Sequence, residues 1–378
     1  MLNTLPVQAA VRQPRAIVRI AGTAVDGWIK WSATNNSYFE ADTFDLQFAI
    51  SQLPSSNDAN WFSQQSEIFI EVLAGFPSNP DQPTAGELTS LIYGRIDTIE
   101  FDPTATVLTL TGRDLTAAFI DKKLTTQYQN QTASAAVTQL AQSHGLSTDQ
   151  ITSTTALIGT YLNKDQVQVQ ATQSEWDFIC WLAREEGFVT YVTAQSLYFG
   201  PDQRDSSDPY VIQWDPPTSD QASPSANVRN LSFSRSMTVA KGITVTVRSP
   251  STTSKTATVQ SYPSAPKAAQ AGKAGPFGNV QTYYYNVEAN LTPQQVEARA
   301  EKLYSQIVSH AMKFSAELPG DVLMTLSQPI QVKGTGTAFD QTYYARQITR
   351  SMSSDEGFAM NVEAQNTTPE LEGAQGDQ

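Results

Sequence analysis

Between residues 16 and 116 the chain alternates apolar and polar residues in five short segments, which limits its fold more than any other feature. Gly, Pro, Asn and Asp separate the segments and favour turns. The clearest pair is a hairpin in which Ile92, Ile96 and Ile99 lead into a turn at 101–106 and the chain returns through Val107. The pattern predicts a small β barrel or sandwich.

Residues 172–200 combine an amphipathic helix with a strand pair. Two reciprocal N-terminal caps fit the sequence, Thr172 with Glu175 or Ser174 with Asp177. The apolar residues at helical spacing are Trp176, Ile179, Cys180 and Ala183. Gly187 ends this helix, Phe188 folds back on its last turn, and the next residues predict two strands around 193–196.

Two more helices and several strands are predicted. One helix spans 132–144 and stops at Gly145, and another begins near Thr292 and Pro293 with Gln295 as a capping partner. Later strands are expected in 228–249, as a pair turning near 240–242, then at 329–332, 343–348 and 358–362. Residues 201–227 and 249–279 are expected to be loops, and the polar tail is expected to be disordered. Lys255, Lys267 and Lys273 of the second loop suggest either docking on an acidic neighbour or simple solvation.

Several motifs occur in a familiar order. They are the run from Glu175 to Phe188 with the strand ending at Gly200, the sequence from Gly112 to Leu115, and the C-terminal series of helix, Pro-Gly turn, strand, Gly334-Thr335-Gly336 bend and tyrosine strand. In these motifs the chain resembles the phage baseplate hub (late control protein D) and VgrG families, and its length and polarity are similar to those of Mu-like tail hub proteins.

This resemblance implies a mainly β fold with an α+β insert, in which two small tail-tube-like β barrels are joined by a small α/β domain and a C-terminal helix. The domains expected are a first barrel at 1–116, an insert at 117–188, a discontinuous second barrel at 189–248 and 318–365, a loop and helix region at 249–317, and a disordered tail at 366–378.

The function implied by the resemblance is structural. The chain is expected to form a homotrimeric ring that joins the sixfold tail tube of a contractile phage to its threefold central spike and leaves a channel for DNA. The expected partners are the spike protein, tail tube or distal tail proteins and a tape measure protein. DNA only passes through. The expected location is the virion baseplate, after assembly in the host cytoplasm.

The composition of the chain agrees with this structural function. With 24 Lys and Arg against 37 Asp and Glu, the net charge is −13, so phosphate binding is not the expected main role. Lys122 and Lys123 are the only adjacent basic pair. No run approaches the ~18 apolar residues of a membrane span. A soluble chain is therefore expected. No secretory signal is visible at the start.

Catalytic and metal-binding patterns are weak, and no catalytic, cofactor-binding or metal-binding residue is predicted. His144 and His310 have no partner nearby in sequence, and a single cysteine, Cys180, excludes a multi-cysteine zinc site and an internal disulfide. The Gly334 bend lacks the third glycine and the Lys of a phosphate loop. The carboxylate pairs Glu185–Glu186 and Asp42–Asp45 suggest caps and solvated faces rather than a glycosidase.

Two other interpretations stay open. A tail-associated cell-wall hydrolase would act on peptidoglycan, and a glycan-binding β protein would recognise the host surface. Aromatic clusters at 283–285 and 343–344 indicate strands covered on both faces, either within the chain or by a neighbouring chain.

Overall fold

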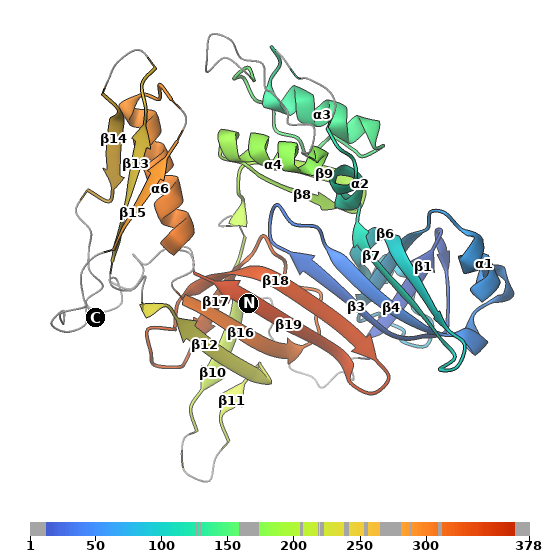
Figure 1. Ribbon diagram of the computed structural model, residues 1–378. Helices are drawn as coiled ribbons and strands as arrows, with labels where there is room; N and C mark the ends of the chain where they lie inside the picture. The colour runs from blue at the N-terminus through green and yellow to red at the C-terminus, as the bar shows by residue number, and fades with distance from the viewer. Residues whose placement is uncertain are drawn as a thin grey trace.

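The structure is a computed structural model of the chain, and it is mainly β (Figure 1). Fourteen described strands form one continuous sheet, and two smaller sheets and a few helices complete the fold. No described helix is long and apolar enough to cross a membrane. The residues that the structure describes are 13–124, 128, 130–158, 174–204, 207–217, 219, 223–237, 242–252, 256–264, 281–287, 289–308 and 312–366.

The first lobe is a curled sheet with strand order β3-β4-β7-β6-β5-β1-β2. Its elements are β1 (Arg15–Ile20), β2 (Thr23–Ala24), β3 (Trp28–Asn36), β4 (Thr43–Ala49), α1 (Ala59–Gln64), β5 (Phe69–Gly75), β6 (Thr89–Asp102) and β7 (Val107–Asp114), with short 3₁₀ turns at Ile50–Gln52, Ser55–Asn57 and Ala85–Glu87. Alternate residues of these strands, including Trp31, Leu46 and Val72, share one buried core. The expected hairpin is confirmed as β6 and β7.

The helical insert follows β7. It contains α2 (Thr116–Asp121), α3 (Ala133–Ser143), α4 (Glu175–Glu186), β8 (Val189–Thr193) and β9 (Ser196–Gly200) around its own core. Of the two predicted caps of α4, Ser174 with Asp177 is present, whereas Thr172 lies outside the described residues. Gly187 ends α4 with a φ of 72°, and the Phe188 N–H donates back to the Ala183 carbonyl, as predicted.

The second lobe extends the first through one strand pair. Its strands are β10 (Tyr210–Asp215), β11 (Ser225–Ala226), β12 (Asn230–Arg235), β16 (Met312–Pro319), β17 (Pro329–Lys333), β18 (Thr342–Ser353) and β19 (Gly357–Gln365). They surround a third core that includes Phe314, Tyr343 and Met360. β18 pairs antiparallel with β3 from Gln347–Asn36 to Ser353–Lys30, so the two lobes share one sheet.

A separate three-stranded sheet packs on α6 (Pro293–Val308). Its strands are β13 (Ile243–Ser249), β14 (Thr258–Tyr262) and β15 (Gln281–Asn286), in the order β14-β13-β15. The expected pairing within 228–249 is wrong, because β12 pairs with β16 whereas β13 pairs with β14 and β15. The loop expected at 249–279 contains β14, and its three lysines lie outside the described residues.

The mainly β class with an α+β insert is confirmed, but the sheets are open. In each lobe the strands curl around one core, yet the hydrogen-bonded ladder of the described strands does not close on itself. α6 begins at Pro293 and is capped by Thr292 and Gln295, as predicted. Of the expected disordered tail, only Asn366 is described, and it hydrogen-bonds to the Met312 backbone; 367–378 lie outside the described residues.

Candidate functional site

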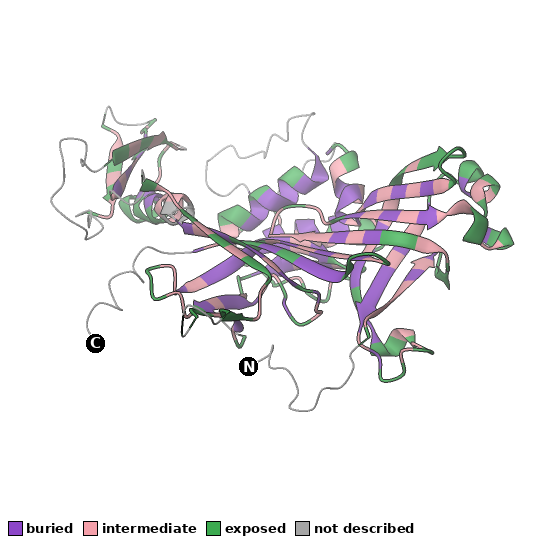
Figure 2. Ribbon diagram, turned by 90° about the horizontal axis from the view of Figure 1, so that it is seen from below, coloured by how far each residue is buried: buried purple, intermediate pink, exposed green. Residues whose placement is uncertain are grey.

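The shared sheet carries a polar face that runs without interruption through both lobes. Eight described strands contribute to it, in the order β6-β7-β4-β3-β18-β19-β16-β12. Since side chains alternate along a strand, the residues opposite the cores all emerge on this face. Figure 2 shows the resulting alternation of buried and accessible positions along the strands.

Cross-strand register places polar side chains in rows that cross the junction of the lobes. One row contains Thr98, Thr111, Asp45, Ser32 and Ser351. A second contains Thr43, Thr34, Thr349, Asn361, Glu317 and Asn230. A third contains Asn36, Gln347, Glu363, Ser315 and Ser232. All of these are half-buried or exposed, and hydroxyl and amide groups predominate among them.

Two side-chain hydrogen bonds join the rows where the lobes meet. Thr34 Oγ1 lies 3.1 Å from Thr349 Oγ1, and Gln347 Nε2 donates to Asn36 Oδ1 at 2.8 Å. These contacts add to the backbone ladder of β3 and β18. The polar face is therefore one stiff surface rather than two separate ones.

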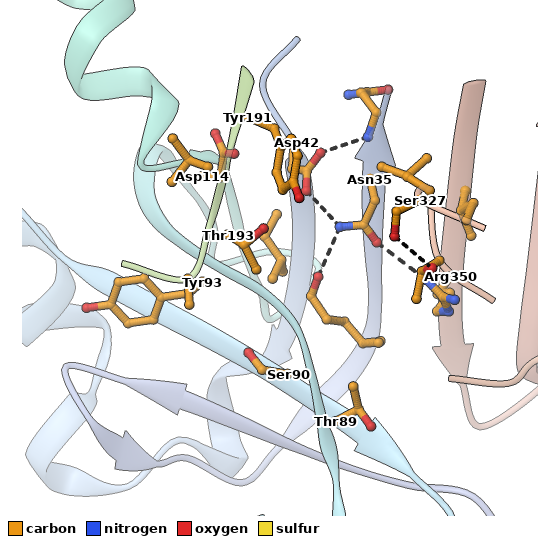
Figure 3. Close-up of a pocket in the computed structure, with 18 of the residues that line it drawn as sticks. Asn35, Asp42, Thr89, Ser90, Tyr93, Asp114, Tyr191, Thr193, Ser327 and Arg350 are labelled. Atoms are coloured by element: carbon orange, nitrogen blue, oxygen red, sulfur yellow. Dashed lines mark hydrogen bonds between the residues drawn. The ribbon is translucent and has the colours of Figure 1, made fainter. Parts of the chain in front are cut away.

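On the core side of the same junction lies a cavity of about 330 Å³ with a buried arginine in its wall (Figure 3). Arg350, on β18 and only 4% exposed, donates from Nε to the Asp321 carbonyl at 2.7 Å and from Nη2 to the Met324 carbonyl. Its Nη1 reaches Asn35 Oδ1 on β3 at 3.4 Å. Burial lowers the pKa of this guanidinium, which stays charged because the usual value is far above neutral pH.

Asn35 also hydrogen-bonds to Asp42, which with Asp114 forms a pair of enclosed carboxyl groups. Asn35 Nδ2 donates to Asp42 Oδ2 at 2.8 Å, and the Asn36 N–H donates to Asp42 Oδ1 at 2.7 Å. Asp114, at the end of β7, accepts from the Thr116 N–H and hydroxyl at 3.1 and 3.0 Å. Burial raises the pKa of Asp42 to about 6 and raises that of Asp114, to which the charge of Asp42 contributes.

This pair makes stability depend on pH. Because the pKa of Asp42 is about 6 when folded and about 3.9 when unfolded, the folded chain binds more protons between these values, and its stability falls as pH rises through that window. We expect Asp42→Asn to remove most of this decline, which the two pKa values put at about 3 kcal/mol. Urea midpoints across the window test it, with exposed Asp355→Asn as control; wild-type and Asp42→Asn curves that run parallel would contradict it.

Arg204, in the segment that follows β9, contacts both lobes. The Arg204 guanidinium lies over the rings of Tyr38 and Tyr344, 5.2 and 4.9 Å from their centroids, and pairs with Asp202. Tyr38 also stacks on Tyr191 of β8. First lobe, insert and second lobe therefore meet at one cation–π contact.

The residues considered for catalysis lie apart. Asp42 faces the junction whereas Asp45 lies on the polar face, and Glu185 pairs with Arg299 of α6 at 3.0 Å. His144 Nε2 lies 2.5 Å from the buried Glu175, a structural contact between α3 and α4. His310 lies outside the described residues, and within the described residues no group of three metal-ligating side chains occurs.

The glycine bend and the tyrosine clusters have local explanations. Asp340 accepts from the Thr335 N–H at 3.0 Å and the Gly336 N–H at 2.9 Å, so its carboxylate occupies the place of a phosphate. Tyr343 and Tyr344 are both buried within the chain. In the other cluster, Tyr284 is 78% exposed while its neighbours in β15 pack on α6.

Sequence reasoning missed Arg350 and Asn35. One signal was present: Arg350 alternates with Ile348 and Met352, so a cation occupies an inward position of an otherwise apolar pattern. A charged side chain in such a place is found with hydrogen-bonding partners. Asn35 carries no comparable signal, because its role depends on which strand pairs with β3.

Comparison with known proteins agrees with this architecture. The sequence profile of the phage tail baseplate hub (GPD) family matches residues 80–355. No curated protein sequence matches significantly. A tail protein from Neisseria meningitidis MC58 has a similar structure, with a TM-score of 0.66 and 16% identity over 94% of this chain and 97% of that one.

Two further solved structures share the fold. The 43 kDa tail protein of prophage MuSo2 from Shewanella oneidensis has a TM-score of 0.63 at 13% identity, covering 94% of this chain and 99% of that one. An E. coli component of the type VI secretion system, described as similar to T4 bacteriophage tail proteins gp27 and gp5, has a TM-score of 0.54 at 13% identity, covering 93% and 77%. At such identities the likeness concerns the fold.

The two lobes, the helical insert and the shared sheet thus define a tail-hub fold of the VgrG-like kind. The chain belongs to the phage tail baseplate hub (GPD) family, whose profile matches most of its length. It is a structural component of a phage tail, as the resemblance predicted.

Proposed function

We propose that three copies of the chain form a ring that joins the tail tube to the central spike and encloses a DNA channel lined by the polar face. The observation that carries this proposal is the run of eight strands from β6 to β12, which within the described residues leaves a free edge at each end. At one end β12 pairs only with β16; at the other, residues 97–102 of β6 pair only with β7. Free edges favour pairing with another chain.

The strand directions fit a head-to-tail ring. Every neighbouring pair from β6 to β12 is antiparallel, so β12 runs opposite to β6. Rotation about a threefold axis preserves strand direction relative to that axis. The β12 strand of one copy would therefore meet β6 of the next in the antiparallel sense, and a heterologous interface of this kind closes into a ring.

The two edges also carry opposite charges. Arg229 directly precedes β12 and Arg235 is its last residue, whereas Asp97, Glu100 and Asp102 lie along the free part of β6. With Ser232 opposite Glu100, antiparallel pairing places Arg235 opposite Asp97 of the next copy, which within its own chain pairs with Arg113, and Arg229 one position beyond Asp102. Such complementarity sets the register of an interface more than its strength.

The other proposed properties follow from the same arrangement. Spike, tube and tape measure proteins would bind the rims of the ring, DNA would only pass through it, and assembly would take place in the host cytoplasm. No step of this function is enzymatic. The domain limits predicted from the sequence stay a prediction.

Disulfide trapping tests the ring. Asn230, Ser232 and Ser234 point to the polar face of β12, as do Thr98, Glu100 and Asp102 on β6. The double variant S232C/E100C should form a covalent trimer under mild oxidation, visible as a threefold ring in negative stain and as three chain masses by light scattering. Cys180 is buried and should give no background.

The matched control is N230C/T98C. In the antiparallel register position 230 lies opposite position 102, four residues from position 98, so the two cysteines would be roughly 13 Å apart and beyond the reach of a disulfide. Trapping of both variants would indicate parallel pairing, and trapping of the control alone would indicate an antiparallel register shifted by four residues; either result would contradict this geometry. A wild-type protein that stays a monomer, with no trapping of either variant at high concentration, would contradict the ring itself.

A further inference from the structure

A pocket on the polar face of the second lobe departs from the chemistry of the rest of that face. It has a volume of about 230 Å³ and lies across β12, β16, β18 and β19. Register places Ser234, Lys313 and Gln365 side by side, with Ser232 and Ser315 in the adjacent row. Arg346 enters from the irregularity that interrupts the pairing of β18 with β19. Hydroxyl, ammonium and guanidinium donors therefore converge on one hollow.

The two cations of this pocket have no ionic partner in the part of the chain that the structure describes. Lys313 and Arg346 form no ion pair there, in contrast to Arg229 nearby, which lies 3.6 Å from Glu317. Glu363 also lines the pocket, yet it pairs with neither. The formal charge of the pocket is thus one positive unit in a chain whose net charge is −13.

The amide of Gln365 has unused hydrogen-bonding capacity. Its Oε1 is enclosed and accepts no hydrogen bond from the described residues. Buried polar atoms normally have a partner. A phosphate diester has no hydrogen to donate to this oxygen, so the oxygen is left to water, and only the amide N–H₂ of Gln365 can donate to a phosphate.

We propose that the pocket binds a phosphate group. The Arg346 guanidinium offers a planar fork and the Lys313 ammonium a point charge, two complementary ways of holding a phosphate, and the serine hydroxyls supply neutral donors. The proposal rests on the proposed function, in which this face lines the DNA channel. The threefold ring would then repeat the site around one level of the channel, where it retains the DNA backbone, while the hydroxyl, amide and acidic side chains of the rest of the face let DNA slide.

An acidic side chain of another protein fits less well. The pocket lies on the face that the ring would turn inward, so a protein group would have to reach it from within the channel. DNA, by contrast, presents phosphates along the whole channel. Free inorganic phosphate offers the same chemical group as the DNA backbone, so the experiment measures the binding of each separately.

The test uses the full chain and a double variant, K313Q/R346Q, whose side chains lie at the surface of the sheet and do not support a core. The matched control K123Q/K333Q removes the same charge from exposed positions that lie outside the pocket and off the eight strands of the polar face. Anisotropy of a labelled short duplex DNA at low salt measures binding, and isothermal titration measures inorganic phosphate. We expect K313Q/R346Q to weaken duplex binding at least tenfold, with the salt slope falling by about 0.9 for the one phosphate that the pocket holds, and the control to match wild type.

The outcomes are distinct. Loss of duplex binding in K313Q/R346Q alone supports the site with DNA as source, and loss of inorganic phosphate binding alone supports it with free phosphate as source. Equal loss in both double variants, or no wild-type binding to either probe, overturns the proposal. Binding of polyglutamate alone, lost in K313Q/R346Q, overturns it in favour of an acidic protein. Negative stain of each variant separates the two proposals: rings without phosphate binding leave the hub intact and remove the site.

Discussion

Arg350→Ala should lower the free energy of unfolding by about 3–5 kcal/mol, although the residue is charged and lies on a strand. The substitution removes donors from the carbonyls of Asp321 and Met324 and from Asn35, all at a junction that water reaches poorly. Each bond to a charged donor contributes more than a neutral one, and the carbonyls left behind lose their partner. Denaturant midpoints of the purified chain measure the loss.

Arg346→Ala is the control for this change. It lies four residues earlier on the same strand but is exposed, so its loss should stay within about 0.5 kcal/mol. Arg350→Lys keeps the charge but not the fork and should fall between the two. If Arg350→Ala unfolds no more readily than Arg346→Ala, the buried arginine does not hold the lobes together.

Local signals predicted much of this fold. The cap of Ser174 with Asp177, the stop at Gly187 and the hairpin of β6 and β7 depend on residues close in sequence, where turn and capping chemistry acts directly. The mainly β class followed from alternation alone. The polar face follows from the same alternation once the strands are ordered.

Long-range pairing could not be predicted in the same way. β12 and β13 both alternate and are neighbours in sequence, yet they join different sheets, and β13 pairs in parallel with β15 across a long connection. Alternation identifies a strand but not its partner. The junction site could not be predicted for the same reason. Asn35 and Arg350 are 315 positions apart in sequence and meet only when β3 pairs with β18.

Gly334→Ala should be the most damaging change in the C-terminal bend, with a loss of about 3–5 kcal/mol. Gly334 has a φ of 96°, which residues with a side chain rarely adopt, and a Cβ there would lie 2.0 Å from the Trp214 carbonyl oxygen of β10. The obstacle is backbone, so it cannot rotate away. Either the parallel pairing of β10 with β17 would open or the bend would shift.

Gly336→Ala separates conformational strain from collision. Gly336 also has a positive φ, 66°, but nothing lies within 4 Å of a Cβ built on it. The cost there should be only the left-handed conformation, about 1 kcal/mol. Thermal and denaturant midpoints compare the two variants. Equal losses would show that the close approach of β10 does not require glycine at 334. The expected gap would mean that packing between strands, and not phosphate-binding chemistry, determines the shape of this bend.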